Sequence, residues 1–153
     1  MSSKASNPDV GVDQVDTSFI DSLVGYNARR ATVVIISSFL KKMDVFDLRP
    51  FYFSVASLIA RNPGITSSQL CSVLGVLPPN LVALVATLEK RGLIARRPHP
   101  NDGRATGLYP TPAGLTLIRE AEEVAFAMEL ESTSRLTTSE RKTLIRLLQK
   151  VYR

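Results

Sequence analysis

Three arginines that can bind an anion lie within one short stretch of this 153-residue chain. Arg96 and Arg97 precede the segment PHPNDG, and Arg104 follows it. From Glu89 to Arg104 there are five basic and two acidic residues, a net charge of +3, whereas the whole chain carries +5. Like charges this close repel each other, so the arrangement is unfavourable unless a polyanion neutralises it. The stretch therefore predicts contact with nucleic acid; the alternative for each arginine alone is a solvated surface charge.

A second set of candidate contacts lies on the helix predicted to start at Pro78. Its buried face is marked by apolar residues at helical spacing, namely Leu81, Leu84, Val85 and Leu88. In a DNA major groove, Asn80 can pair bidentately with adenine, and Val82 and Ala83 can touch thymine methyl groups. The alternative for Val82 and Ala83 is half-buried packing. The residues predicted to face DNA are Pro79, Asn80, Val82, Ala83, Thr87 and Lys90.

The start of the preceding helix offers contacts for phosphate. Thr66-Ser67-Ser68-Gln69 has the pattern of a capping box, in which side chains satisfy free backbone N–H groups. The hydroxyl and backbone N–H groups of Thr66, Ser67 and Ser68 are candidate phosphate ligands. Capping alone would also explain Thr66.

These candidates are positioned by a predicted helix-turn-helix and a hairpin. The first helix opens at Thr66 and ends at Gly75, and the second begins at Pro78 and is followed by Gly92. Two short strands, Leu93–Arg97 and Thr106–Tyr109, flank a turn rich in Pro, Asn, Asp and Gly. This order predicts a winged helix-turn-helix in a mainly α fold with a small β-hairpin.

The same stretch resembles the MarR family of bacterial transcriptional regulators. The resemblance lies in NPGITSSQL, in LEKRGLIARRPHPNDGRA and in PTPAGLTLI. It extends more loosely through RPFYFSVASLIA and LTTSERKTLIRLL, so it covers most of residues 45–150. Each segment alone is a weak match, and their order and spacing make the assignment specific.

The resemblance implies roles for the wing, the basic hairpin. Asp102-x-Arg104 matches the family's Asp-x-Arg motif, in which Arg104 would reach a minor groove and Asp102 would hold the basic residues of the hairpin. Gly103 stands where the family often has arginine. The small apolar residues of the second helix also replace the Ser, Thr and Arg common in the family. The glycine is expected to make the wing bind less tightly or flex more, and the plain second helix leaves more of the specificity to DNA shape and to the wing.

The flanking segments predict an N-terminal tail and dimerisation helices. Residues 1–15 form a predicted disordered tail, and residues 16–48 carry a long helix from Asp16 or Thr17 to about Met43. The run VVII at 33–36 leaves this helix little polar face, so a partner subunit is expected to cover it; the alternative is that the same chain covers it. Residues 49–111 form the predicted DNA-binding lobe, starting with a helix over Pro50–Arg61. Residues 112–153 form two further dimerisation helices, the first capped by Thr111 with Pro112 in its first turn and the second opened by the capping box Thr137-Thr138-Ser139-Glu140.

Composition excludes several other functions. One cysteine rules out an intramolecular disulfide framework and a cysteine-based zinc finger, and one histidine argues against a histidine-rich metal site, so no cofactor is expected. No triad or pair of catalytic acids can be assembled, which argues against an enzyme. Cys71 is expected to be a small core residue, and His99 a surface or phosphate-facing side chain rather than a ligand. Without an apolar signal core or a membrane-spanning run, the expected location is the cytoplasm.

The predicted function is a homodimeric repressor that binds double-stranded DNA at a pseudo-palindromic operator. The resemblance further implies a small-molecule effector, often phenolic or aromatic. The candidate effector-binding residues are Tyr26, Arg29, Arg30, Phe51 and Phe53; ordinary packing and surface charge are the alternative for each. A rival function is a winged helix used for protein–protein contact without DNA.

Overall fold

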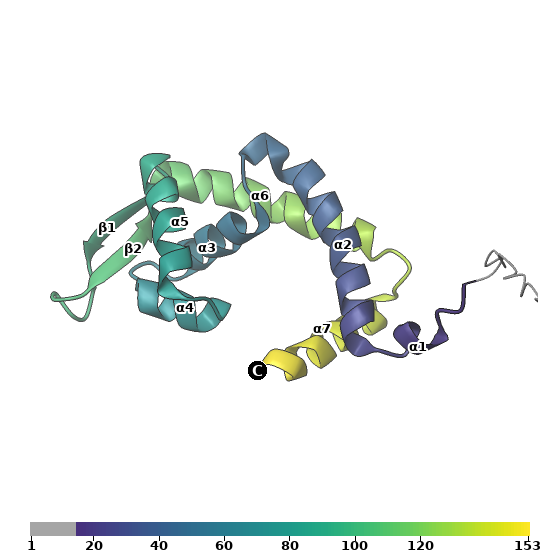
Figure 1. Cartoon of the computed structure of the whole chain (residues 1–153). Helices are drawn as coiled ribbons and strands as arrows, with labels where there is room; N and C mark the ends of the chain where they lie inside the picture. The colour runs from purple at the N-terminus through teal and green to yellow at the C-terminus, as the bar shows by residue number, and fades with distance from the viewer. Residues whose placement is uncertain (1–14) are drawn as a thin grey trace, which may run out of the picture. The chain divides into compact units, whose positions relative to one another are not determined.

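A computed structural model describes residues 15–153, so the predicted tail lies outside the described residues except for Val15. The chain divides into two compact units, Met1–Val33 and Val34–Arg153, and each is described by itself. Figure 1 labels the elements along the chain.

The first unit contains α1 (Ser18–Asp21) and the beginning of α2 (Val24–Met43). The prediction of one unbroken helix from Asp16 or Thr17 is wrong, because the chain leaves the helix at Ser22 and Leu23. The Ser22 hydroxyl donates to the carbonyl of Phe19, and the Asn27 amide donates to the carbonyls of Asp21 and Leu23. These side chains satisfy carbonyls that a continuing helix would use, which stabilises the break.

The second unit is a winged helix-turn-helix with two long helices after it. After a 3₁₀ turn at Asp44–Phe46, its helices are α3 (Pro50–Arg61), α4 (Ser67–Leu74), α5 (Pro78–Lys90), α6 (Pro112–Ser132) and α7 (Thr138–Tyr152). The strands β1 (Ile94–Pro98) and β2 (Thr106–Pro110) pair antiparallel, from Ile94 opposite Pro110 to Pro98 opposite Thr106. The predicted fold class is confirmed.

The predicted helix ends are confirmed by their caps. Thr66 and Thr137 both form complete capping boxes, with Gln69 and Glu140 respectively. Thr111 caps α6 by accepting the N–H of Gly114, and proline occupies the first turn of α3, α5 and α6. Caps of this kind contribute about 1 kcal/mol each, so local sequence sets where these helices begin.

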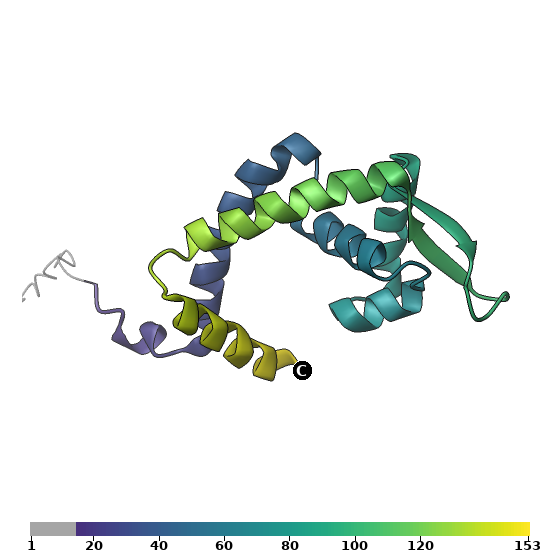
Figure 2. The same ribbon diagram turned by 180° about the vertical axis from the view of Figure 1, so that it is seen from behind.

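One apolar core joins α3, the helix-turn-helix, the hairpin and α6. Figures 1 and 2 show α3 alongside α6, and α5 next to the hairpin. Fully buried side chains come from each of these parts: Ile59 from α3, Leu70 from α4, Leu81 and Leu88 from α5, Leu108 from β2 and Ala121 from α6. Burial of one such side chain contributes about 1.5–3 kcal/mol, so the core holds the wing and both motif helices in one unit.

The C-terminal helix α7 keeps its apolar stripe exposed. Leu144, Ile145, Leu147 and Leu148 are 40–48% exposed, and Val151 and Tyr152 are 70% exposed or more. No residue of α7 is buried. No single helix among residues 15–153 is long and apolar enough to cross a membrane; α4 and α5 reach the required length and composition only together, bent by 118°.

Candidate nucleic-acid interface

The turn between α4 and α5 sets the angle of the second helix. Gly75 adopts a left-handed conformation (φ 64°), which ends α4 and lets the N–H of Val76 donate to the carbonyl of Cys71. Leu77 then precedes the proline start of α5. The 118° bend between the two helices lies in the range of a helix-turn-helix.

The face of α5 opposite the core is open to solvent. Leu81, Leu84, Val85 and Leu88 are buried, while all six residues predicted to face DNA are exposed. Val82 is 62% exposed and Ala83 is also exposed, so the alternative that they are half-buried packing residues is wrong.

Two polar side chains on this face differ in their freedom to bind. Asn80 has no side-chain partner among residues 15–153, so its amide can pair with a base edge. The Thr87 hydroxyl donates to the carbonyl of Ala83 at 2.9 Å and keeps only its acceptor capacity for DNA.

The three candidate phosphate ligands at the start of α4 are not equivalent. The Thr66 hydroxyl is 3.2 Å from the backbone N of Gln69 and 3.1 Å from its side-chain oxygen, and that same oxygen accepts the N–H of Thr66. Thr66 is therefore occupied with capping. Ser67 and Ser68 are exposed and remain the better phosphate candidates.

The three wing arginines have three different surroundings. Arg96 Nε lies 3.1 Å from Oε2 of Glu89, an ion pair that links β1 to α5. The Arg97 guanidinium lies over the ring of Tyr109, 5.7 Å from its centroid. The Arg104 side chain has no partner within residues 15–153. Sequence reasoning missed Glu89 and Tyr109 as partners, because their pairing depends on how strand and helix cross.

Asp102 shapes the tip of the wing through the backbone. Its carboxylate accepts the backbone N–H of Arg104 at 3.0 Å, and its carbonyl accepts the N–H of Ala105. Asp102 thus fixes the turn from which the Arg104 side chain projects. His99 is half-buried, and its Nδ1 lies 3.2 Å from the backbone N of Asn101.

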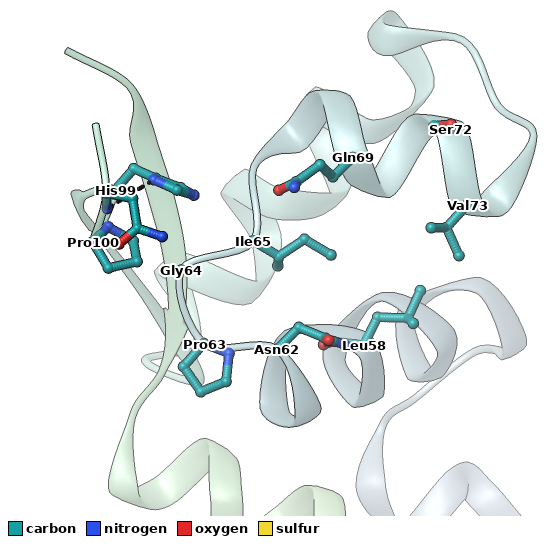
Figure 3. A pocket seen from close by; sticks show the side chains of 11 residues that line it. Leu58, Asn62, Pro63, Gly64, Ile65, Gln69, Ser72, Val73, His99 and Pro100 are labelled. Carbon is teal, nitrogen blue, oxygen red and sulfur yellow. Dashed lines mark hydrogen bonds between the residues drawn. The ribbon is translucent and has the colours of Figure 1, made fainter. Parts of the chain in front are cut away.

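The wing approaches α4 across a shallow pocket of about 530 Å³. Figure 3 shows Gly64 on the loop between α3 and α4, with His99 and Pro100 of the wing beside it. Leu58, Ile65 and Val73 provide its apolar part, and Gln69 and Ser72 come from α4. The lining contains no Lys or Arg, so this pocket does not extend the basic surface.

The candidate effector residues are divided between the two units. Tyr26, Arg29 and Arg30 lie on α2 in the first unit, where Arg30 Nη1 lies 3.1 Å from the Tyr26 hydroxyl. Phe51 and Phe53 lie on α3 and pack against the core, and Phe53 meets Phe39 edge-on at 5.5 Å.

A second cavity, of about 710 Å³, lies between α3 and α6 and is lined by Phe53 but not Phe51. Beside it, Arg61 and Ser57 both donate to the carboxylate of Glu122. Partial burial acts to raise the pKa of Glu122, but the hydrogen bonds from Ser57 and Arg61 outweigh it and hold the pKa below its ordinary value. The cavity therefore combines two aromatic side chains, Phe53 and Phe126, with three glutamates and two arginines, Arg61 and Arg119.

Within residues 15–153, no group of three or more His, Cys, Asp or Glu side chains is placed to hold a metal ion. Cys71 is half-buried and packs against the core.

Known proteins are similar to this chain in both sequence and fold. Residues 46–105 match the model of the MarR family. A candidate transcriptional regulatory protein for the hcr operon of Thauera aromatica is 30% identical over 131 residues, 85% of this chain and 79% of that protein.

Two solved structures of one repressor are similar over almost the whole chain. The transcriptional repressor CouR bound to a 23-mer DNA duplex gives a TM-score of 0.84 at 30% identity, covering 92% of this chain and 99% of that one. CouR bound to p-coumaroyl-CoA gives a TM-score of 0.79 with the same identity and coverage. With the helix-turn-helix, the basic wing and these relatives in agreement, the chain belongs to the MarR family of transcriptional regulators.

Proposed function

We propose that the protein is a transcriptional repressor that binds double-stranded DNA as a homodimer at a pseudo-palindromic operator in the cytoplasm. The observation that carries the proposal is the open face of α5 next to a wing with three exposed arginines. The relative CouR, 30% identical, is a repressor whose structure was solved on DNA.

In this proposal the N-terminal half of α5 enters the major groove. Asn80 reads adenine, and Val82 and Ala83 contact thymine methyl groups. Lys90, Arg96 and Arg97 contact phosphates, and so do Ser67 and Ser68 at the start of α4. Arg104 enters the flanking minor groove, where a narrow A·T-rich sequence attracts it.

The dimer is proposed to form through residues 16–48 and 112–153, with residues 49–111 as the DNA-binding lobe. The exposed apolar stripe of α7 supports this assignment, because a second copy would remove it from water. Two symmetric copies would place their α5 helices in major grooves about 34–36 Å apart, one helical turn.

The repressor is further proposed to release DNA when a small aromatic or phenolic effector binds. The support is that CouR, the relative, was also solved with p-coumaroyl-CoA, a phenolic acid carried on a large anionic group. Phe53, in the cavity between α3 and α6, would accept an aromatic ring. Tyr26, Arg29 and Arg30 remain effector candidates from the sequence alone.

A fluorescence anisotropy titration tests DNA binding, using the duplex upstream of the protein's own gene and an unrelated duplex of equal length. We expect tight binding to the first only, weakening steeply as salt rises. Arg104→Ala should weaken it by at most about 3 kcal/mol. Arg135→Ala, in the exposed loop between α6 and α7, is the matched control and should change little. A well-folded dimer that binds neither duplex at low salt would instead support a protein–protein module.

A further inference from the structure

We propose that Tyr109 is a positioning residue for DNA binding, whose ring aims the guanidinium of Arg97 at the DNA backbone. The inference rests on the proposed DNA-binding function and adds a residue that does not itself touch DNA. Tyr109 lies on β2 opposite Ala95, and Arg97 lies opposite Gly107. Arg97 and Tyr109 are therefore diagonal neighbours on one face of the hairpin.

The ring reaches Arg97 because Gly107 leaves the space between them open. A Cβ added to Gly107 would lie 3.1 Å from Cε2 of Tyr109, so the ring lies against this glycine. The guanidinium of Arg97 then meets the ring at 5.7 Å from its centroid. An aromatic ring that covers a strand glycine is a known way to fix a hairpin, and its face attracts a cation.

The ring is itself held on two further sides. The Tyr109 hydroxyl donates to the carbonyl of Pro98 at 3.0 Å, which ties β2 to the end of β1. On the other side passes Gly64, which is buried and adopts a φ of +93°. A Cβ at Gly64 would lie 3.1 Å from the Tyr109 hydroxyl oxygen and 2.8 Å from Pro100. Figure 3 shows this crossing of the Gly64 loop and the wing.

Backbone pairing fixes the same crossing. The N–H of Gly64 donates to the carbonyl of Leu108 at 2.8 Å, and the N–H of Leu108 donates to the carbonyl of Ile65 at 2.9 Å. Leu108 is buried beside Tyr109 in β2. The ring of Tyr109 is thus held between the hairpin and the loop that leads into α4. The Arg97 guanidinium that lies over this ring therefore has a fixed position relative to the helix-turn-helix.

The geometry can be tested without DNA. In NMR spectra of the free protein, ring currents should displace the side-chain signals of Arg97 from their free-arginine positions. Tyr109→Phe should keep this displacement, because the ring still lies against Gly107 without its hydroxyl, and Tyr109→Leu should abolish it. Unchanged Arg97 signals in Tyr109→Leu would overturn the proposed contact.

A double-mutant cycle tests the function with operator DNA. Without the ring, each Arg97 side chain must be ordered when DNA binds, so in a dimer with two wings Tyr109→Leu should raise Kd on the order of 5- to 150-fold. In an Arg97→Ala background, Tyr109→Leu should raise Kd less than about twofold, because the arginine that the ring positions is absent. Tyr109→Phe should stay within about twofold of wild type.

Three outcomes separate the possible failures. If the wild-type protein does not bind the operator, the proposed function fails. If it binds and Tyr109→Leu binds equally well, only the role of Tyr109 fails. If Tyr109→Leu weakens binding equally with and without Arg97, Tyr109 acts through general stability and the inference is wrong. Ile118→Val, a buried change in α6, is the stability control and should lower Tm without changing Kd.

Discussion

Replacing Glu89 by glutamine should tighten DNA binding. The Glu89 carboxylate on α5 holds Arg96 Nε at 3.1 Å, and the two side chains are 39% and 42% exposed. Because solvent screens such a pair, it contributes at most about 1 kcal/mol to folding. In a complex with DNA, the same carboxylate competes with phosphate for Arg96 and adds a negative charge next to the DNA backbone.

Two terms give the size of the effect. Arg96 no longer has to leave an ion pair, which spares up to about 1 kcal/mol. A carboxylate about 8 Å from a phosphate in water repels it by about 0.5 kcal/mol, and glutamine removes this repulsion. The sum is roughly 0.5–1.5 kcal/mol per wing. Two wings in a dimer give about 1–3 kcal/mol, which lowers Kd on the order of 5- to 150-fold.

Anisotropy titrations at several salt concentrations measure both Kd and its salt dependence. Each negative charge removed next to the DNA should steepen the slope of log K against log salt by up to about 0.9 units, hence by up to about 1.8 units for a dimer. Glu123→Gln is the control, since it makes the same charge change at an exposed position of α6, where Glu123 has no ion pair among residues 15–153. Weaker binding by Glu89→Gln with an unchanged slope would refute the reasoning, because Glu89 would then be orienting Arg96 rather than competing for it.

Three further changes test the fold and the site. Gly107→Ala would place a Cβ 2.8 Å from a backbone carbonyl oxygen and should lower the free energy of unfolding by about 1–3 kcal/mol in urea titrations, whereas Gly103→Ala meets open space and should change it little. Glu122→Gln should make the free energy of unfolding depend less on pH in the acid range. The lowered pKa of the Glu122 carboxyl means that its contribution to stability is present above pH 4.5 and is lost as pH falls through the folded pKa. Equal acid sensitivity of the two proteins would contradict the assignment. Thr66→Ala should lower the free energy of unfolding by about 1 kcal/mol with little change in Kd for DNA. Ser67→Ala should raise Kd for DNA with little change in stability. The reverse pattern would mean that Ser67 is the cap and Thr66 the phosphate contact.

Local signals predicted most of the winged helix. Caps and prolines act within four residues, so the starts of α4, α6 and α7 followed from Thr66, Thr111 and Thr137. The apolar stripe of α5 predicted its buried face, because burial follows the helical period. The Asn27 side chain was harder to anticipate: it satisfies carbonyls at the break before α2, and an amide inside a helical pattern gives no sign of that.

The contacts that orient the wing depend on tertiary structure. Glu89 and Arg96 are seven residues apart and meet because a turn reverses the chain between α5 and β1. Gly64 and Gly107 are far apart in sequence, and their close approach follows from the pairing of Ile65 with Leu108. The sequence shows that these residues are present, but which of them contact each other depends on how the strand, the loop and the helix cross in the folded protein.

The unequal surroundings of the wing arginines also have an entropic consequence. Arg97 is already ordered by Tyr109, so it loses little rotamer freedom when DNA arrives. Arg104, without a side-chain partner in residues 15–153, would lose its freedom only on contact, at a cost of about 0.5–1.5 kcal/mol. The base of the wing therefore meets DNA as a preformed surface, while the ordering of its tip is postponed to the moment of binding.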